Sequence, residues 1–418
     1  MAIHSLNLLK GNINRPGGIY LQPKAPLSPL TMTPPTTQPL PSHQLSIEDF
    51  AALAPENAPD IAFFYYSNPV YSSLSPQRIE LLLSKVPLAV SFSPFLDETS
   101  RFADYILPDC LPLERWDDRL FPPASPVGGW GIGQPCISAA GESRHSGDVI
   151  LELAQRQGGS MAAALPWKSF EELLKHRARG LHAAHSGSVC VDPFNQGLVG
   201  EMERRGWWVS NNDSFDEFWQ KLIEAGAWSD PNYQVRSLSD YSGYPDGKID
   251  LCSRNLQQRL ARSKKPATEI ECLPHFHSEE EPPISLDHPL TLNPNRPGKL
   301  GTGTHSILPS VLQRIGVHES VQWNSWAEIN AADARVQGIR NLDWIWVESA
   351  TGKVKVRAVV SAGAGPGVVN MPYGLGHTEM GRWARGRGVN PLKLLVAERD
   401  PLSGLSYRIG TRVKIYRA

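Results

Sequence analysis

The sequence lacks the features that would place it at once in a common class of protein. Its five cysteines (Cys110, Cys136, Cys190, Cys252 and Cys272) form no CxxC pair. This argues against a disulfide framework, a structural zinc site, and an iron–sulfur cluster held by this chain alone. The formal net charge is −1, so charge gives no reason to expect nucleic acid or an anionic membrane as a partner.

Long hydrophobic segments are missing as well. No run approaches about 18 apolar residues, and the N-terminus has no basic segment followed by an apolar core, so we expect neither a membrane-spanning helix nor an export signal on this chain. With 41% hydrophobic and 20% charged residues, the composition is globular. The 36 prolines are unusual and predict long ordered loops in a chain with room for two or three domains.

Residues 60–108 carry the pattern of a parallel α/β sheet. Two apolar runs, "DIAFFYYSNP" and "VPLAVSFSPF", predict buried strands, and "LSPQRIELLLSK" between them predicts a helix capped at Ser75. A short helix in "DETSRFADYILP" leads into a third strand, which completes the β-α-β-α-β pattern of a doubly wound domain. Ligands bind beyond the carboxyl ends of such strands, where Asn68 and residues 91–99 lie.

The rest of the chain divides into two parts. In residues 119–285, "FPPASPVGGWGIGQP" predicts a rigid loop, capping boxes at Ser169 and Ser214 predict helices, and "DGKIDLCS" predicts a strand; their order in space is not predicted. From residue 288, five short strands are separated by Gly, Asn and Pro turns, and "DWIWVESATGKVKVRAV" predicts a hairpin. A helix is expected in "WAEINAADARVQGI". This region therefore predicts a small closed β-barrel.

Two glycine-rich stretches are candidates for ligand binding. In "NPNRPGKLGTGTHS" (residues 293–306), glycines allow close backbone approach, while Arg296, Lys299 and several hydroxyl groups suit a phosphate or a polar heterocycle. It is not a Walker loop, and an ordered barrel loop with solvated cations is the alternative. The second stretch is "MPYGLGHTEMGRWARGRGVNP" (residues 371–391), a basic glycine-rich loop. A nucleic-acid patch would suit such a loop, but the chain as a whole is not basic, so we expect no nucleic-acid partner. The alternative is a disordered surface loop, and Tyr373 and Trp383 argue against full disorder.

The acidic pairs Asp97/Glu98 and Asp117/Glu114 could act as general acid and base. Nothing in their spacing requires this, and we expect capping or surface roles instead. We interpret Cys110 as structural because no helper ligand lies near it in the sequence.

Several separated motifs together resemble a known family. They are "SLNLLKGNINRPGG", "NPVYS", "VSFSPFLDETSRFADYILPD", "LERWDD", "WAEINAADA", "DWIWVESATGKVKVRA" and "PGVVNMPYGLGHTEMGRWARGRGVNPL". In this order they resemble the C-terminal half of molybdopterin oxidoreductases of the dimethyl sulfoxide reductase superfamily, closest to its polysulfide, thiosulfate, tetrathionate and arsenate reductase branch. The resemblance covers residues 1–115 and 286–418.

The resemblance implies a fold and a cofactor. It divides the chain into a helix end with a Pro-rich linker (1–45), the second part of a Rossmann-like α/β domain (46–160), a helical or irregular connecting region (161–285), and a six-stranded double-psi β-barrel (286–418). In the family, the α/β domain and the barrel hold bis(molybdopterin guanine dinucleotide) with molybdenum. Carried over by position, the cofactor-binding residues are Asn68, Ser93, Thr99, Gly301, Thr302, Gly303, Thr304, His305, Ser306, Asn330, Tyr373, His377 and Asn390.

The sequence also departs from the family. The cysteine cluster for a [4Fe–4S] centre and the protein ligand to molybdenum lie, in the family, before the matched region, so we expect no Fe–S cluster, metal ligand or catalytic residue here. The resemblance therefore implies a truncated enzyme or a split subunit that is active only with the missing half.

Further partners follow from the resemblance. They would be an N-terminal molybdopterin/Fe–S half, a ferredoxin-like Fe–S subunit and a membrane quinone-reactive subunit, on the periplasmic side of the membrane. The alternative is a cofactor-free structural subunit of a quinone-linked respiratory complex. The resemblance implies two-electron chemistry on a sulfur or oxyanion compound but does not indicate which one.

Overall fold

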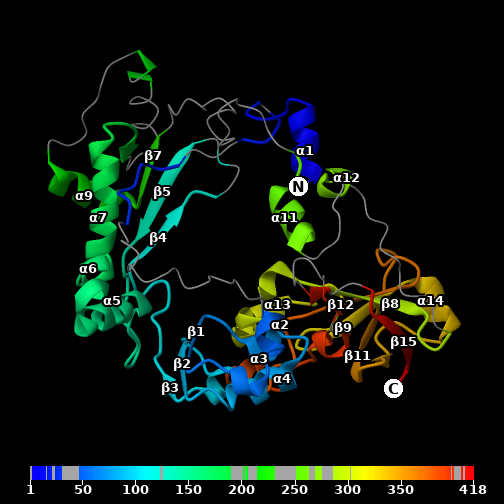
Figure 1. The fold of residues 1–418 in the computed structure, drawn as a ribbon. Helices are drawn as coiled ribbons and strands as arrows, with labels where there is room; N and C mark the ends of the chain where they lie inside the picture. The colour runs from blue at the N-terminus through cyan, green and yellow to red at the C-terminus, as the bar shows by residue number, and fades with distance from the viewer. Residues whose placement is uncertain are drawn as a thin grey trace. The chain divides into compact units, whose positions relative to one another are not determined.

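The computed structural model divides the chain into two compact units, shown in Figure 1. Unit 1 comprises Met1–Pro41 and Asp109–His277, and unit 2 comprises Ser42–Pro108 and Ser278–Ala418. Residues 109–160 thus belong to unit 1, whereas residues 46–108 share unit 2 with the barrel. The structure describes residues 2–15, 17–20, 24–30, 47–122, 125, 127–189, 201–202, 204–205, 214–230, 251–262, 269–274, 286–301, 303–396, 398–399, 406–407 and 410–418.

Unit 2 begins with a three-stranded parallel sheet. Its strands are β1 (Ile61–Tyr65), β2 (Leu88–Phe92) and β3 (Tyr105–Ile106), in the order β1-β2-β3. The connections are α3 (Pro69–Ser72) with α4 (Pro76–Leu83), and η2 (Ser100–Phe102); α2 (Ile47–Ala51) and η1 (Pro55–Asn57) precede them. Helix α4 starts at a proline, where the missing N–H costs nothing, and buries its apolar stripe against the sheet. The predicted β-α-β-α-β pattern is confirmed.

The C-terminal part of unit 2 is a closed six-stranded barrel, as expected. Its strands are β8 (Leu290–Asn295), β9 (Trp326–Ile329), β10 (Trp344–Ser349), β11 (Lys353–Val360), β12 (Val368–Pro372) and β15 (Arg412–Arg417), in the order β10-β11-β9-β12-β8-β15. The predicted hairpin is β10–β11. Alternating inward residues such as Ile345, Val347 and Val356 are fully buried and form the barrel core.

One barrel strand was missed in the sequence. The residues "WAEI" were assigned to a helix, but they form β9, parallel to β11 and antiparallel to β12. The helix α14 (Ala331–Val336) begins only after Asn330. Strand pairing on both sides of β9 overrides the weak helical preference of four residues, which no local pattern reveals.

Short helices cover the outside of the barrel. They are η3 (Gly298–Leu300), η4 (Thr304–Ile307), α13 (Pro309–Arg314), α15 (Gly381–Ala384) and η5 (Pro391–Leu394). The strands β13 (Glu398–Arg399) and β14 (Ser406–Tyr407) pair with each other. A second apolar cluster lies under η3 and α13, with Leu300, Leu312 and Trp326 at its centre.

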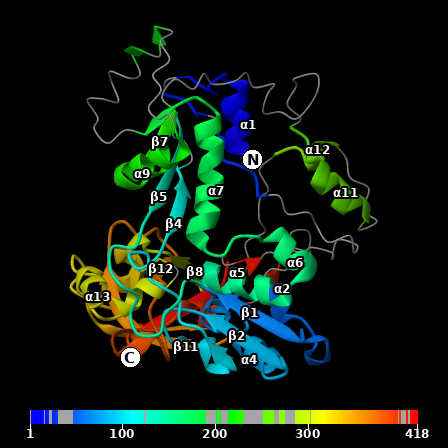
Figure 2. The same ribbon diagram turned by 90° about the vertical axis from the view of Figure 1, so that its left-hand side faces the viewer.

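Unit 1 is built on an antiparallel sheet. Its strands are β4 (Asp117–Leu120), β5 (Gly128–Gly133), β6 (Ser188–Val189) and β7 (Ala227–Asp230), in the order β4-β5-β7-β6. The helices are α1 (Ala2–Leu9), α5 (Ser146–Gln157), α6 (Gly159–Ala164), α7 (Phe170–Ala183), α9 (Phe215–Ala225), α11 (Arg254–Arg262) and α12 (Glu269–Cys272). Figure 2 shows α7 running along the sheet, where Trp130 and Trp228 are fully buried.

The sequence predictions for unit 1 were partly correct. Ser169 and Ser214 accept the backbone N–H groups of Glu172 and Glu217, so both predicted caps are confirmed. Residues 128–133, assigned to a loop, form β5; a side chain at Gly129 would collide with the Phe121 ring, which explains glycine in this strand. The predicted strand at 246–253 lies largely outside the described residues.

Within the described residues, no helix is long and apolar enough to cross a membrane.

Candidate functional site

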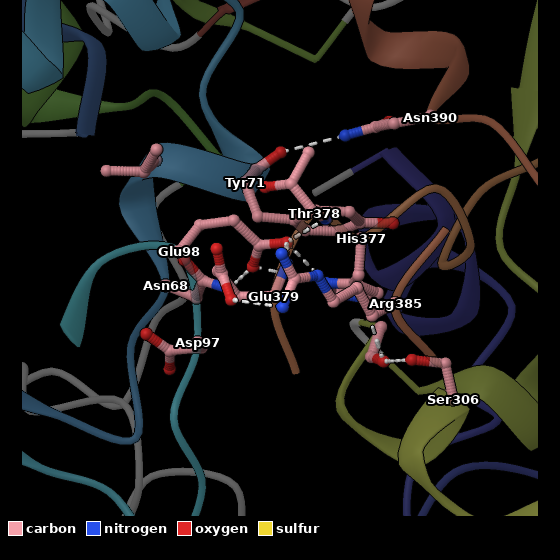
Figure 3. A network of polar contacts seen from close by, with 12 residues as sticks. Asn68, Tyr71, Asp97, Glu98, Ser306, His377, Thr378, Glu379, Arg385 and Asn390 are labelled. Carbon is pink, nitrogen blue, oxygen red and sulfur yellow. Dashed lines mark hydrogen bonds and ion pairs between the residues drawn. The ribbon is translucent and has the colours of Figure 1, made fainter. Parts of the chain in front are cut away.

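A buried polar network joins the α/β sheet of unit 2 to the last loop of the barrel (Figure 3). Its centre is Glu98, which follows β2 and is 6% exposed. The Glu98 carboxylate accepts N–H groups from the Asn68 side chain at 2.7 Å and from the backbone of Thr378 at 2.7 Å and Glu379 at 3.2 Å. It also contacts His377 Nδ1 at 3.1 Å. One carboxylate thus holds together residues that are about 280 positions apart in the sequence.

The orientation of Asn68 is fixed by a directional chain of hydrogen bonds. The Val70 N–H donates to Thr99 Oγ1 at 3.2 Å, and the Thr99 hydroxyl donates to Asn68 Oδ1 at 2.8 Å. Asn68 Nδ2 is therefore the group that faces Glu98. Asn68 and Thr99, both predicted to bind the cofactor, are brought together at the carboxyl ends of β1 and β2, as the fold rule requires.

The neighbouring carboxylates Asp97 and Glu98 have different roles. Asp97 Oδ1 accepts the backbone N–H groups of Thr99 and Ser100 and the Ser100 hydroxyl, so its predicted capping role is confirmed. Burial raises the pKa of Asp97, although these hydrogen bonds oppose the shift. Glu98 was expected to cap or to lie on the surface. That expectation was wrong, because the barrel loop covers its carboxylate and supplies donors to it.

The second acidic pair has only local contacts. Glu114 accepts the backbone N–H of Leu111 at 2.8 Å, and Asp117 pairs with the exposed Arg119 at 3.6 Å. The predicted capping and surface roles hold for this pair.

Tyr71 and Asn390 extend the network. The Tyr71 ring stacks on the His377 ring with centroids 3.8 Å apart, and its hydroxyl donates to the Leu375 carbonyl at 2.8 Å. Asn390 Nδ2 donates to the Tyr71 carbonyl at 2.9 Å. Burial raises the pKa of the Tyr71 hydroxyl far above its usual range, and the charge of Glu98 adds to the effect. Tyr71 is therefore a neutral hydrogen-bond donor.

The first glycine-rich stretch lies beside this network. Gly303 is buried with φ at +109°, and a Cβ there would lie 2.9 Å from the Tyr71 ring and 3.1 Å from His377 Nε2. The Gly303 carbonyl accepts the Ser306 hydroxyl at 2.6 Å and contacts His377 Nε2 at 3.2 Å. Only glycine fits this position, because of both the conformation and the close ring packing.

The other predicted residues of this stretch point in different directions. Gly301 has φ at +59° and accepts the Arg296 guanidinium on its carbonyl at 2.7 Å. Thr304 and His305 are exposed, and His305 Nδ1 lies 3.1 Å from the Lys299 carbonyl. Thr302 lies outside the described residues.

The second glycine-rich stretch places three exposed arginines, Arg382, Arg385 and Arg387, next to the first stretch. The packing of α15 against η4 brings the two stretches together. Glu379 lies 3.9 Å from Arg385 and 3.5 Å from Arg101, which places Arg101 at the same edge. With the exposed Lys299 and Arg296, this surface carries an excess of positive charge.

The comparisons with known proteins agree with this geometry. Residues 305–407 match the family model described as "Molydopterin dinucleotide binding domain". The menaquinone reductase molybdopterin-binding-like subunit of Nitratidesulfovibrio vulgaris is 27% identical over all of this chain and half of that protein. The thiosulfate reductase molybdopterin-containing subunit PhsA of Salmonella typhimurium is 24% identical over 96% of this chain and 53% of that protein. The chain is therefore similar to molybdopterin-binding proteins of the dimethyl sulfoxide reductase superfamily.

A solved structure has a similar fold over most of this chain. Acetylene hydratase from Pelobacter acetylenicus superimposes with a TM-score of 0.59 at 20% identity, over 85% of this chain and 44% of that one. The chain spans about half the length of the relatives that it matches. The relatives include molybdopterin-containing reductase subunits.

The donor set of the chain fits the superfamily's dinucleotide cofactor in part. The cations at 296–299 and 382–387 suit a pyrophosphate, and exposed Thr304 and His305 add hydrogen-bonding groups. In contrast, Asn68, Thr99 and Asn390 already use their polar atoms on protein partners. Among the described residues, no three His, Cys, Asp or Glu side chains are grouped to hold a metal ion.

Three further predicted residues also lie outside the network. Ser93 forms a local turn with Phe95, and Asn330 caps α14 and donates to the Ala364 carbonyl at 2.9 Å. Tyr373 is buried, and its backbone N–H donates to the Asn295 carbonyl at 2.9 Å. Their contacts explain the conformation of the chain at each position, and a role toward the cofactor stays a prediction.

Two members of the network, Tyr71 and Glu98, were not predicted. Both lie inside the recognised motifs "NPVYS" and "LDETS", so the motifs contained the signal. Neither residue has a local pattern that indicates a partner some 280 to 304 positions away. Only the docking of the barrel loop onto the sheet gives them their partners.

Acid should weaken this network at a predictable pH. Burial alone would raise the pKa of Glu98, but hydrogen bonds from His377, Asn68 and Glu379 outweigh it and lower the pKa from 4.5 to about 2. Glu98 therefore stabilises the fold above pH 4.5, and this contribution of about 3 kcal/mol is lost as the pH falls toward 2. Urea unfolding of unit 2 between pH 5 and pH 3 should show this slope.

The Glu98→Gln variant provides the comparison, because it does not titrate. Asp97 has a raised pKa, of which the charge of Glu98 is a minor cause, and contributes the opposite slope. The difference between the two curves therefore measures Glu98 together with the groups that its charge affects, Asp97 and His377. Parallel curves would show that Glu98 does not drive the acid response.

Proposed function

We propose that the chain is the dinucleotide-binding C-terminal portion, or a split subunit, of a molybdenum oxidoreductase. The observation that carries the proposal is the packing of η4 (Thr304–Ile307), at the end of the first glycine-rich stretch, against α15 (Gly381–Ala384), where the arginine loop 382–387 begins. The arginine loop and the end of the glycine-rich stretch lie within the matched domain at 305–407, and this surface presents the positive charge that a guanine dinucleotide pyrophosphate needs. The bound group would be bis(molybdopterin guanine dinucleotide), shared with another polypeptide.

When bound, the cofactor would supply two-electron redox chemistry at molybdenum on a sulfur or oxyanion substrate. The residues of this chain would bind and orient it. Arg382, Arg385, Arg387 and Lys299 would neutralise phosphate charge, and Thr304 and His305 would donate hydrogen bonds from η4. The buried network below them would keep the two stretches at a fixed separation.

A partner polypeptide is part of the proposal. Parallel sheets are normally covered on both faces, yet Ile61, Phe63 and Tyr65 on one face of β1 are 50–60% exposed. The relatives are about twice as long as this chain, and several are named as subunits. We infer that a molybdopterin and Fe–S polypeptide packs in this region, and that an Fe–S subunit and a quinone-reactive subunit complete the electron path.

The proposal is tested by measuring molybdenum and guanine nucleotide in the native complex. Reversing two charges with Arg385→Glu and Arg387→Glu should reduce bound guanine at least about tenfold, because each lost charge-assisted bond contributes about 1.5–3 kcal/mol. Arg335→Glu, on the exposed surface of α14, is the matched control and should retain the nucleotide. Equal guanine content in all three proteins would contradict the assignment of this surface.

One alternative is favoured by a specific observation. Asn68, Thr99 and His377 satisfy one another and Glu98 without a ligand, and one relative is named "molybdopterin-binding-like". Both points support a cofactor-free structural subunit of a quinone-linked respiratory complex. An intact native complex that contains neither molybdenum nor guanine would establish this alternative and exclude the first proposal.

A further inference from the structure

His377 lies between two groups that can only accept hydrogen bonds. Its Nδ1 is 3.1 and 3.2 Å from the two oxygens of Glu98, and its Nε2 is 3.2 Å from the Gly303 carbonyl. A carbonyl oxygen has no proton to give. The Glu98 carboxylate already accepts three other N–H groups, so it acts as an ionised acceptor. Both ring nitrogens must therefore carry a proton to make both contacts.

The surroundings of the ring also suit a positive charge. The Tyr71 ring is stacked on it at 3.8 Å with an angle of 12° between the planes, which is the geometry of a cation–π contact. His377 is 3% exposed, so a charge there needs an ionised partner in direct contact, and Glu98 provides one. A neutral ring would place the lone pair of one ring nitrogen against an acceptor oxygen.

The titratable and charged groups in and around this pair can be named element by element. The loop after β2 contributes Asp97 and Glu98, and α3 contributes Tyr71. The barrel loop contributes Glu379, Tyr373 and Arg385, whose backbone pairs with that of His377. The pKa of Glu98, lowered to about 2, agrees with a carboxylate that faces a cation.

We propose that His377 is held as a doubly protonated imidazolium and that it positions the Gly303–Ser306 segment of the ligand surface. The imidazolium is bound on one side by Glu98 and on the other by the Gly303 carbonyl, which also accepts the Ser306 hydroxyl and backbone N–H. Losing either proton removes one side of this link. The effect on ligand binding rests on the proposed function, whereas the protonation state and the positioning do not.

The first test is nuclear magnetic resonance of the full chain labelled with ¹⁵N-histidine at about pH 7.5, where an unperturbed histidine (pKa about 6.5) is mostly neutral. We expect His377 to show two protonated ring nitrogens and the Glu98→Gln variant to show one. The His377→Gln variant assigns the signal among the 12 histidines. If that variant fails to fold, Tyr71→Leu assigns it instead, through the lost ring-current shift. A neutral His377 in the unmodified chain would overturn the proposal.

The second test is amide hydrogen exchange of peptides that cover residues 303–308. His377→Gln should raise their exchange about tenfold, because a lost buried hydrogen bond contributes about 1 kcal/mol or more. His318→Gln, at an exposed histidine of the same unit, should leave them unchanged. Unchanged exchange in His377→Gln would refute positioning. If the imidazolium and the faster exchange are found but the complex contains no guanine, the proposed function fails and this inference stands.

Discussion

Replacing Glu98 with alanine should lower the stability of unit 2 by about 3–5 kcal/mol, the usual effect of removing one partner from a buried ion pair. The variant leaves the buried donor of His377, and the partly buried donors of Asn68 and Thr378, without their acceptor. Each of these donors made a hydrogen bond of normal length to the same carboxylate, so removing that carboxylate breaks all three bonds at once. Hydrogen exchange by mass spectrometry on the barrel peptides and on residues 60–106 measures it.

Glu379→Ala is the matched control for this prediction. It removes the same side chain one residue beyond Thr378, but its ion pairs with Arg101 and Arg385 are long and exposed, so we expect a change of about 0–1 kcal/mol. Both variants also retain the backbone of their loops. If Glu98→Ala behaves like Glu379→Ala, the network does not join the two parts of unit 2.

Replacing Gly376 with alanine should be similarly damaging, at roughly 3–5 kcal/mol. Gly376 has φ at +83°, and a Cβ there would collide with the backbone nitrogen of Asn390 and the carbonyl carbon of Val389. Backbone atoms cannot move aside as a flexible side chain can. The barrel loop would have to shift, and Asn390 would lose its bond to the Tyr71 carbonyl.

Gly386→Ala separates the two causes of this effect. Gly386 also has a positive φ, +69°, but no atom lies within 4 Å of a Cβ at that position. Replacing Gly386 with alanine should lower the stability only by the cost of holding a non-glycine residue at a positive φ, about 1–2 kcal/mol. The thermal transition temperature of the barrel should therefore be much lower in Gly376→Ala than in Gly386→Ala. Equal transition temperatures would show that the loop can relax.

Much of the fold was readable because its signals are local. The apolar runs at 61–65 and 88–92, the proline that starts α4, and the two serine caps act within a few residues of each other. Strands β9 and β5 were missed because neither carries such a local signal. The first is four residues long and follows only from pairing with β11 and β12, and the second consists largely of glycine.

The sequence by itself determined the α/β sheet, the barrel, the resemblance to a family, and the two glycine-rich stretches. Only the tertiary structure decided that Glu98 leaves the surface and binds His377, and that Asn68 and Thr99 bond to each other. It also decided that residues 46–108 belong with the barrel. The physical reason is that strands and caps depend on residues close in the sequence. The network depends on contacts across about 280 to 320 positions, which exist only once the barrel loop packs on the sheet.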